Sequence, residues 1–252
     1  MHHFFTAPEE ICREQGQVRI TGTDVNHIRN VLRMGAGQEI LVSDGTGKDY
    51  RCRICSMDKE QVEAQILEEC PGRELGAKIT LYQGLPKSDK MELIIQKAVE
   101  LGAARIVPVA TRNAVVRLEG KKEEGKIKRW RAIAESAAKQ SMRSMIPEVT
   151  SVMRFEEAVS EAEGSLGFFA YENQKGMKET EALLSQIKAG RDVSVFIGPE
   201  GGFDPEEAAC ARERGLSPVS LGKRILRTET AGLALLSMIM LRLEVEEERK
   251  DG

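Results

Sequence analysis

The chain of 252 residues is long enough for one large domain, or for a small domain joined to a larger one, with ample material for a buried core. Its composition is that of an ordinary globular protein, with 41% hydrophobic and 31% charged residues. Because 37 basic and 40 acidic side chains give a formal charge of -3, the chain is not a pervasively basic nucleic-acid-binding domain, and any contact with RNA must come from local clusters.

The first part of the chain has the pattern of short strands joined by turns. Residues 17–20 form a strand candidate, and apolar residues at helical spacing between Thr23 and Met34 predict a helix. Strand patterns over 39–43 and 49–56 flank the sequence Asp44-Gly45-Thr46-Gly47. Residues of these types tolerate positive φ angles, so we expect a β-hairpin at this turn.

A domain boundary is predicted where Pro and Gly residues cluster, between Cys70 and Gly76. Before it, residues 61–67 alternate well enough to be a further strand, which completes a compact β-barrel-like module. After it the periodicity changes. We therefore predict a small domain over residues 1–72 and a larger one over residues 73–252.

Strand and helix patterns alternate after the boundary, which predicts an α/β domain with a mainly parallel sheet covered on both faces. The last helix candidate is nearly all apolar in its centre, so we expect it to be buried against the sheet or against a partner subunit. Strand candidates lie at 79–83, 105–110, 166–170, 193–197 and 218–221. Helix candidates lie at 89–102, 126–142, 177–188, 205–214 and 228–244.

The cysteines and histidines do not have the spacing of a metal site. Cys52 and Cys55 form a lone C-x-x-C inside a strand-like run, without a second cysteine pair or a nearby histidine to complete four ligands. The only histidines are His2, His3 and His27. We therefore expect no metal site, and we expect the cysteines to be reduced structural thiols. No secretory leader and no apolar run of about 18 residues is present, which predicts a cytoplasmic protein without a membrane span.

A glycine-rich turn, Gly198-Pro199-Glu200-Gly201-Gly202, follows the strand candidate 193–197. Asp204 is a good N-cap for the next helix, and Glu207 stands where a capping box places its carboxylate. The turn therefore lies at the carboxyl end of a strand, where open α/β sheets bind ligands, and its glycines let the backbone approach a flat ligand closely. A bare turn of this kind is more often a tight connection without a ligand. A phosphate cradle is disfavoured because neither phosphate-binding motif is present and Glu200 would repel an anion.

A second loop, Leu221 to Thr230, also leaves a strand candidate and enters a helix. Two arginines bracket an apolar pair in Arg224-Ile225-Leu226-Arg227, beside a glycine. This arrangement suits a pocket that holds an adenine-like ring by backbone hydrogen bonds and van der Waals contact. A purely structural interpretation makes Thr228 an N-cap and Glu229 a partner of the helix dipole, and both interpretations can hold at once.

A third cluster lies where the helix candidate 126–142 runs out into a loop. Basic residues gather along this helix and before it, and for them a solvated helix face is the favoured interpretation. Gln140 and Arg143 differ, because they stand at the junction of helix and loop, where they can meet a substrate.

Together with Pro86–Lys90 and Glu100–Gly102, these segments resemble the bacterial 16S ribosomal RNA uridine-N3 methyltransferases of the RsmE type, over nearly the whole chain. The segment 27–33, followed by Asp44-Gly45, is similar to the PUA-like RNA-binding module of that family. The two loops described above are similar to its cofactor-binding half. One departure is Met142-Arg143-Ser144-Met145, where the family more often has a Gly-Arg-Asn-Arg-like run.

The resemblance implies an N-terminal PUA-like β-barrel and a C-terminal domain of the SPOUT class, an α/β fold with a trefoil knot that binds S-adenosylmethionine. It also implies a homodimer with sites at the subunit interface, no metal, and methylation of N3 of a specific uridine in 16S ribosomal RNA of the small ribosomal subunit. The cofactor-binding positions carried over are Ile197, Gly198, Pro199, Glu200, Gly201, Gly202, Leu221, Gly222, Ile225, Leu226, Arg227 and Thr228.

Methylation of uridine N3 requires loss of the N3 proton, so the site must stabilise a uracil anion, which a guanidinium does by charge-assisted hydrogen bonding. Arg143 is the first candidate for this role and Arg227 the second, with Glu229 as a proton acceptor or pocket organiser. Candidates for RNA phosphate contacts in the N-terminal module are Arg29, Arg33, Arg51 and Arg53.

Two other functions remain open from the sequence. A non-catalytic RNA-binding or ribosome-assembly factor would keep the fold without the chemistry. A methyltransferase of the same class acting on transfer RNA or on a ribose hydroxyl would share the cofactor pocket, since the sequence does not itself fix the target nucleotide.

Overall fold

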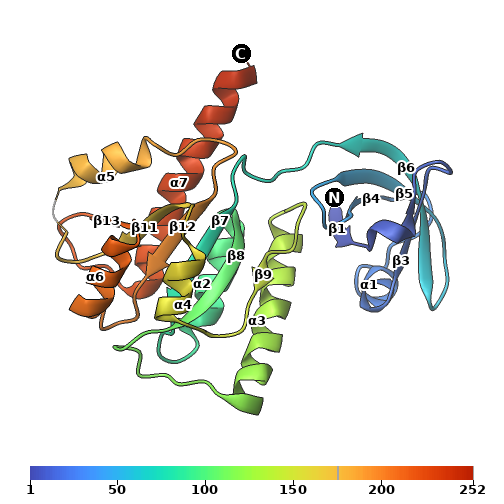
Figure 1. Ribbon diagram of the computed structural model, residues 1–252. Coiled ribbons are helices and arrows are strands. Elements are labelled where there is room, and N and C mark those ends of the chain that lie inside the picture. Colours follow the sequence, from blue (N-terminus) through green and yellow to red (C-terminus); the bar gives the residue numbers. More distant parts are fainter. Residues whose placement is uncertain (175, 252) are drawn as a thin grey trace. The chain divides into compact units, whose positions relative to one another are not determined.

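The computed structural model describes residues 1–174 and 176–251, and it divides into two compact units (Figure 1). The smaller unit comprises residues 1–74 and 138–146. The larger unit comprises residues 75–137 and the chain from residue 147 onward. Residues 138–146 therefore belong to the same unit as the N-terminal module, although the chain reaches them through a helix of the larger unit.

The smaller unit is built on a six-stranded sheet in the order β1-β4-β5-β6-β3-β2. The predicted hairpin is confirmed, because β4 and β5 pair antiparallel with Ser43 opposite Asp49 on either side of the turn. The sequence patterns missed β1, which pairs parallel with β4, and the very short β2. The strands are β1 (His2–Phe5), β2 (Ile11–Cys12), β3 (Gln17–Thr21), β4 (Glu39–Ser43), β5 (Asp49–Met57) and β6 (Gln61–Cys70).

The helix predicted between Thr23 and Met34 is present in a different form. It starts as α1 (Thr23–Asn26) and continues as η2, a π-helical turn over His27–Val31. Val25 and Ile28 from this segment are buried in the core of the sheet. Arg33 then takes a φ of 53°, which ends the helical backbone.

The larger unit contains the predicted parallel sheet, in the order β10-β8-β7-β12-β11-β13, with β9 also paired to β8. The predicted spans 166–170 and 193–197 are reproduced by β11 and β12. The short strands β9 and β10 were not predicted. The strands are β7 (Ile79–Gly84), β8 (Ala103–Ala110), β9 (Glu148–Val149), β10 (Met153–Arg154), β11 (Leu166–Ala170), β12 (Val193–Ile197) and β13 (Ser217–Val219).

Helices cover both faces of this sheet, as predicted (Figure 1). On one face, α4 and α6 bury Phe155, Ala158 and Ala208 against Tyr82 and Phe196 of the strands. The other face carries α2 and α7, which contact each other, and α7 also contacts β12. The helices are α2 (Lys90–Glu100), α3 (Gly120–Gln140), α4 (Phe155–Glu161), α5 (Met177–Leu184), α6 (Pro205–Glu213) and α7 (Thr228–Asp251).

The final helix α7 begins at the predicted residue and runs further than the predicted 228–244. Its apolar centre is buried through Leu235, Leu236 and Ile239. In the part of the chain that the structure describes, no helix combines the length and the apolar character that a membrane crossing requires.

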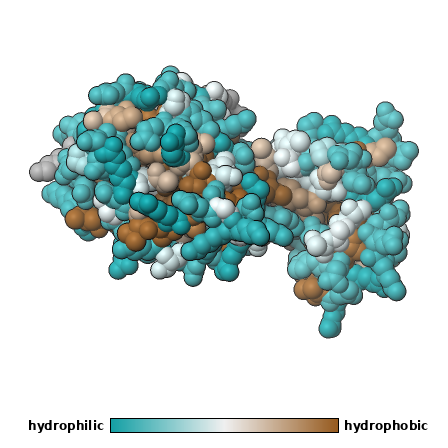
Figure 2. Space-filling view, turned by 60° about the horizontal axis from the view of Figure 1, so that its bottom comes forward, coloured by the Kyte–Doolittle hydropathy of each residue, from teal (hydrophilic) through white to brown (hydrophobic). Residues whose placement is uncertain are grey.

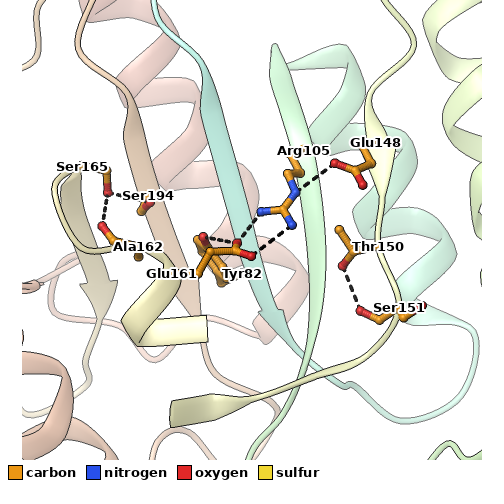
Figure 3. A network of polar contacts seen from close by, with 9 residues as sticks. All are labelled: Tyr82, Arg105, Glu148, Thr150, Ser151, Glu161, Ala162, Ser165 and Ser194. Atoms are coloured by element: carbon orange, nitrogen blue, oxygen red, sulfur yellow. Dashed lines mark hydrogen bonds and ion pairs between the residues drawn. The ribbon is translucent and has the colours of Figure 1, made fainter. Parts of the chain in front are cut away.

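A polar network anchors α4 to the sheet (Figure 3). The Tyr82 ring stacks on Phe196 with ring centroids 4.3 Å apart, and its hydroxyl donates to Glu161 Oε1 over 2.9 Å. Arg105 from β8 forms an ion pair with Glu161 and donates from Nε to Glu148 Oε2 at 3.0 Å. The hydrogen bond from Arg105 lowers the pKa of the Glu161 carboxyl. Glu161 therefore joins α4 to both β7 and β8.

Replacing Glu161 by Gln is expected to lower the free energy of unfolding of the protein by about 1 kcal/mol at pH 7, since a half-exposed pair contributes little more. Because the pKa of Glu161 is lower in the folded state, its contribution is present above the unfolded pKa, about 4.3, and is lost as pH falls further. Denaturant unfolding of the wild type and the variant from pH 7 to pH 3 measures this difference.

Glu156→Gln is the matched control, because Glu156 is an exposed glutamate on the same helix. It should leave the unfolding free energy nearly unchanged at every pH. A difference between wild type and Glu161→Gln that stays constant down to pH 3 would show that the Glu161 charge does not stabilise the fold.

Candidate functional site

The glycine-rich turn connects β12 to α6, and the predicted capping box is confirmed. The Asp204 side chain accepts a hydrogen bond from Glu206 N over 2.9 Å, and Glu207 Oε2 accepts from Asp204 N over 2.9 Å. Pro205 occupies the first helical turn. The local sequence therefore fixes where the turn ends and the helix begins.

Neighbouring segments hold the turn on two sides. A Cβ atom on Gly84, at the end of β7, would lie 2.7 Å from Pro199 Cδ, so only glycine lets Pro199 approach this closely. Asn113 Nδ2 donates to the carbonyl oxygens of Gly201 at 3.1 Å and Gly202 at 3.3 Å. The backbone of the turn is thus braced by residues far away in the sequence.

Glu200 is held by the start of α2. Its carboxylate accepts from the backbone N–H of Lys87 at 3.2 Å and from Lys90 Nζ at 2.9 Å. Partial burial raises the pKa of Glu200, but these hydrogen bonds outweigh it and keep the pKa below its usual value. Glu200 therefore repels an anion less than an unpaired carboxylate would, because Lys90 offsets its charge.

The second loop is joined to the first by Thr228. Its hydroxyl donates to the Gly198 carbonyl oxygen over 2.7 Å and accepts from Gln83 Nε2 over 2.9 Å. The prediction of Thr228 as an N-cap is wrong: Thr228 is the first residue of α7, and Ala231 N donates to the Arg227 carbonyl oxygen over 2.8 Å. The Thr228 hydroxyl therefore donates to the carbonyl oxygen of Gly198, far away in the sequence, and does not cap its own helix.

A cavity of about 400 Å³ opens at the carboxyl ends of β11, β12 and β13. Its volume is in the range of small-molecule sites. Both predicted loops line it, and of the predicted cofactor positions only Gly201 is not among the lining residues described. The lining residues that sequence reasoning missed are Lys90, Ala170, Tyr171, Glu172, Gln174, Phe203, Val219, Ser220 and Ala231.

Four of these nine missed residues lie at the end of β11 or directly after it. The strand 166–170 itself was predicted, and the rule that ligands bind at the carboxyl ends of parallel strands applies to it as well. Recognising Ala170 to Gln174 would have required the knowledge that β11 lies next to β12, which no local pattern provides.

Two of the predicted catalytic residues lie at this cavity. Arg227 is exposed and lines it. Glu229 lies beside it, largely buried, with Oε2 3.3 Å from Lys90 Nζ. Lys90 therefore stands between two carboxylates, those of Glu200 and Glu229, and the hydrogen bond to Glu200 raises the pKa of its ammonium group.

Arg143, the first candidate for the catalytic role, belongs to the smaller unit and is 5% exposed. Its Nε donates to the two carboxylate oxygens of Glu74 at 3.0 and 2.9 Å. Glu74 Oε1 also accepts from the backbone N–H groups of Ser144 at 2.9 Å and Met145 at 3.1 Å. Met142, where the family pattern has glycine, adopts a φ of 61°. Glu74 is thus a partner of Arg143 that the sequence did not reveal.

The predicted RNA-binding arginines fall into two pairs. Arg51 and Arg53 project from the same face of β5 and both form ion pairs with Glu39, at 3.3 and 3.1 Å, and Arg51 also pairs with Glu68. Arg29 and Arg33 are exposed on and after η2, and among the described residues neither has a salt bridge. Arg29 and Arg33 are therefore the more available pair for phosphate groups.

Among the described residues, no group of three or more His, Cys, Asp or Glu side chains is arranged to hold a metal ion. The cysteines are free thiols, and burial raises the pKa of Cys52 to about 12, which makes it unreactive.

Comparison with known proteins identifies the family. A family model for an RNA methyltransferase domain matches residues 73–240, and one for an RNA methyltransferase PUA domain matches residues 20–67. Ribosomal RNA small subunit methyltransferase E of Bacillus subtilis is 36% identical over 248 residues, covering 96% of this chain and 97% of that protein. The protein of the same name from Synechocystis is 32% identical, covering 96% of this chain and 78% of the relative.

A solved structure agrees with these relatives. The crystal structure of a ribosomal RNA small subunit methyltransferase E from Neisseria gonorrhoeae bound to S-adenosyl methionine is 32% identical and superimposes with a TM-score of 0.82. The match covers 96% of this chain and 97% of that one. The chain therefore belongs to the RNA methyltransferase family that includes the ribosomal RNA small subunit methyltransferases E.

Proposed function

We propose that this protein transfers a methyl group from S-adenosylmethionine to N3 of a uridine in 16S ribosomal RNA of the small ribosomal subunit. The observation that carries the proposal is the cavity at the carboxyl ends of β11, β12 and β13, walled by the two loops of the family pattern. The choice of N3 rests on the resemblance to the uridine-N3 methyltransferases. A ribosomal substrate would place the activity in the cytoplasm.

The cavity suits S-adenosylmethionine in size and in its apolar and backbone lining. Apolar side chains such as Ile197 and Leu226, with the backbone of the glycine turns, fit a flat adenine ring. The charged lining residues are Lys90, Glu172, Glu200, Lys223, Arg224 and Arg227, so both signs of charge are present. When the cofactor is bound, its sulfonium supplies an electrophilic methyl group, and the carboxylates of Glu172 and Glu200 in the lining can attract its positive charge.

The protein's own residues have to bring the base to that methyl group and stabilise its anion. Arg227 is exposed at the cavity wall, so its guanidinium is available to a uracil oxygen. Arg143 is buried and is oriented by Glu74, so it would act as a fixed donor. Glu229, beside Lys90, is the carboxylate proposed to accept the N3 proton or to organise the pocket.

The proposed function is tested with purified protein, S-adenosylmethionine and 16S ribosomal RNA or small subunits that lack the modification. Mass spectrometry of the nucleosides should find N3-methyluridine. Methylation of a ribose, of another base or of transfer RNA would contradict the target. Binding of S-adenosylmethionine without methylation of any RNA would favour a non-catalytic assembly factor.

Arg143→Lys keeps the positive charge but removes the planar fork that pairs with Glu74. If Arg143 stabilises the uracil anion, the single-turnover methylation rate should fall about 100-fold. The affinity for S-adenosylmethionine should not change, because Arg143 does not line the cavity. The same exchange at Arg227 tests the second candidate, and Arg191→Lys, at an exposed arginine, is the control. Full activity of Arg143→Lys would remove Arg143 from the mechanism.

We propose further that the smaller unit binds the RNA backbone, chiefly through Arg29 and Arg33. Replacing Arg29 by Gln and Arg33 by Asn removes both charges, and Asn tolerates the positive φ of position 33. The slope of log K against log salt should become shallower by about 1.5, since each phosphate contact contributes about 0.7 to 0.9. Filter binding to 16S ribosomal RNA over a range of salt concentrations measures this slope.

The control is the pair Arg51→Gln and Arg53→Gln, whose charges are already offset by Glu39 and Glu68. This pair should change the slope less than the first pair does. Equal slopes for the wild type and the Arg29 and Arg33 variant would place the RNA contacts elsewhere.

We also propose that the protein is a homodimer. Hydrophobic residues reach the surface in patches among hydrophilic ones (Figure 2). Leu241 on α7 is 60% exposed and Leu93 on α2 is 44% exposed, on two helices that contact each other. Exposed leucines on neighbouring helices are typical of an interface that a second subunit covers.

Leu241→Glu is therefore expected to shift the protein from dimer to monomer, because the new charge would lose its hydration in the interface. Light scattering after size-exclusion chromatography distinguishes a particle of twice the chain mass of 27.9 kDa from the single chain. The control is Lys178→Glu, at an exposed position on α5. Leu184→Glu would not serve as a control, because Leu184 is buried. A wild-type protein that is monomeric at all concentrations would contradict the proposal.

A further inference from the structure

We propose that Gln83 is a positioning residue of the cofactor pocket, acting through the Thr228 hydroxyl on the backbone of Gly198. The identity of the ligand rests on the proposed function, but the contacts that carry the inference do not. Gln83 is not among the residues that line the cavity, and no motif in the sequence marks it.

Gln83 lies in β7, directly opposite Ile197 of β12, and its side chain is completely buried. Its Nε2 donates to the Thr228 hydroxyl at 2.9 Å and to the Gly84 carbonyl oxygen at 2.9 Å. The Gly84 carbonyl oxygen can only accept a hydrogen bond. The Gln83 amide must therefore point its nitrogen, not its oxygen, toward Gly84 and Thr228. The orientation of the Gln83 amide is therefore determined by its surroundings.

This orientation determines the direction of the Thr228 proton. A hydroxyl has one proton, and Gln83 already supplies the proton for the hydrogen bond that the Thr228 oxygen accepts. The single proton of Thr228 is then directed to the Gly198 carbonyl oxygen, 2.7 Å away. The three groups form one chain of hydrogen bonds, from β7 through the start of α7 to the glycine turn.

The other end of the Gln83 amide supports a role beyond packing. Its Oε1 is buried and has no hydrogen-bond partner among the residues that the structure describes. It lies near Gly232 of α7, where an added Cβ would be 3.8 Å from it. An unpartnered buried oxygen costs stability, which an apolar side chain of similar size would avoid. Packing therefore does not account for a glutamine here, whereas donation to Thr228 does.

The chain of hydrogen bonds acts on the part of the turn that faces the ligand. Gly198 and Thr228 both line the cavity, one in each of its two loops. Gly198 also packs tightly, since a Cβ there would lie 3.0 Å from the Gly202 backbone. If Gln83 no longer holds the Thr228 hydroxyl, the two loops lose their fixed relation, and a ligand that contacts both should bind more weakly.

The test uses Gln83→Met, which keeps the side-chain length and removes the donor, together with Thr228→Val and Thr228→Ser. Isothermal titration calorimetry with S-adenosylmethionine should give a Kd about 10-fold higher for Gln83→Met and Thr228→Val. Thr228→Ser should stay within about 3-fold of the wild type, because the hydroxyl is kept. The double variant Gln83→Met with Thr228→Val should bind no more weakly than Thr228→Val alone, since both act through one hydroxyl.

Ser194→Ala is the matched control for general destabilisation. Ser194 is a buried residue of the same sheet, hydrogen-bonded to Ser165 and away from the two loops. It should lower the melting temperature without changing the Kd. If Gln83→Met does not fold, Gln83→Leu replaces it in the same comparison.

A Kd for Gln83→Met equal to that of the wild type would overturn the inference, as would losses of affinity that add in the double variant. A wild-type protein that binds no S-adenosylmethionine would instead contradict the proposed function. In that case the hydrogen-bond chain is tested by exchange of the Ala231 and Gly202 amides, which should quicken in Gln83→Met and not in Ser194→Ala. Unchanged exchange in Gln83→Met would then overturn the inference.

Discussion

The cofactor pocket depends on one hydrogen bond, from the Thr228 hydroxyl to the carbonyl oxygen of Gly198. It joins two loops that are 30 residues apart and that follow different strands of the sheet. Around it, Gly84 admits Pro199 at close range and Asn113 holds the far end of the glycine turn. Because these contacts exist within the protein itself, we expect the pocket to be formed before any ligand binds, which would lower the cost of binding.

The two loops also carry charged side chains. Lys90 lies between Glu200 and Glu229, so two carboxylates that would otherwise repel each other are held together beside the cavity. Arg143 has its own carboxylate partner, Glu74, in the smaller unit. Arg143 and Glu229 are therefore each paired with a half-buried side chain of opposite charge, whereas Arg227 is exposed.

Local features of this site were predictable from the sequence, and distant contacts were not. The strand before the glycine turn and the capping box at Asp204 depend on neighbouring residues, so both were predicted correctly. The sequence suggested Thr228 as an N-cap of its own helix, because the acceptor of its hydroxyl, the Gly198 carbonyl oxygen, is far away in the sequence. The residues after β11 were missed because strand order is a long-range property. The trefoil knot, implied by the resemblance alone, stays a prediction.

Hydrogen–deuterium exchange in the absence of cofactor shows whether contacts between the two loops form the pocket before a ligand binds. We expect the amides of residues 198–202 and 221–231 to exchange slowly in the free protein, and S-adenosylmethionine to slow them further together with residues 170–174. Rapid exchange of both loops in the free protein, with protection only after the cofactor is added, would contradict it.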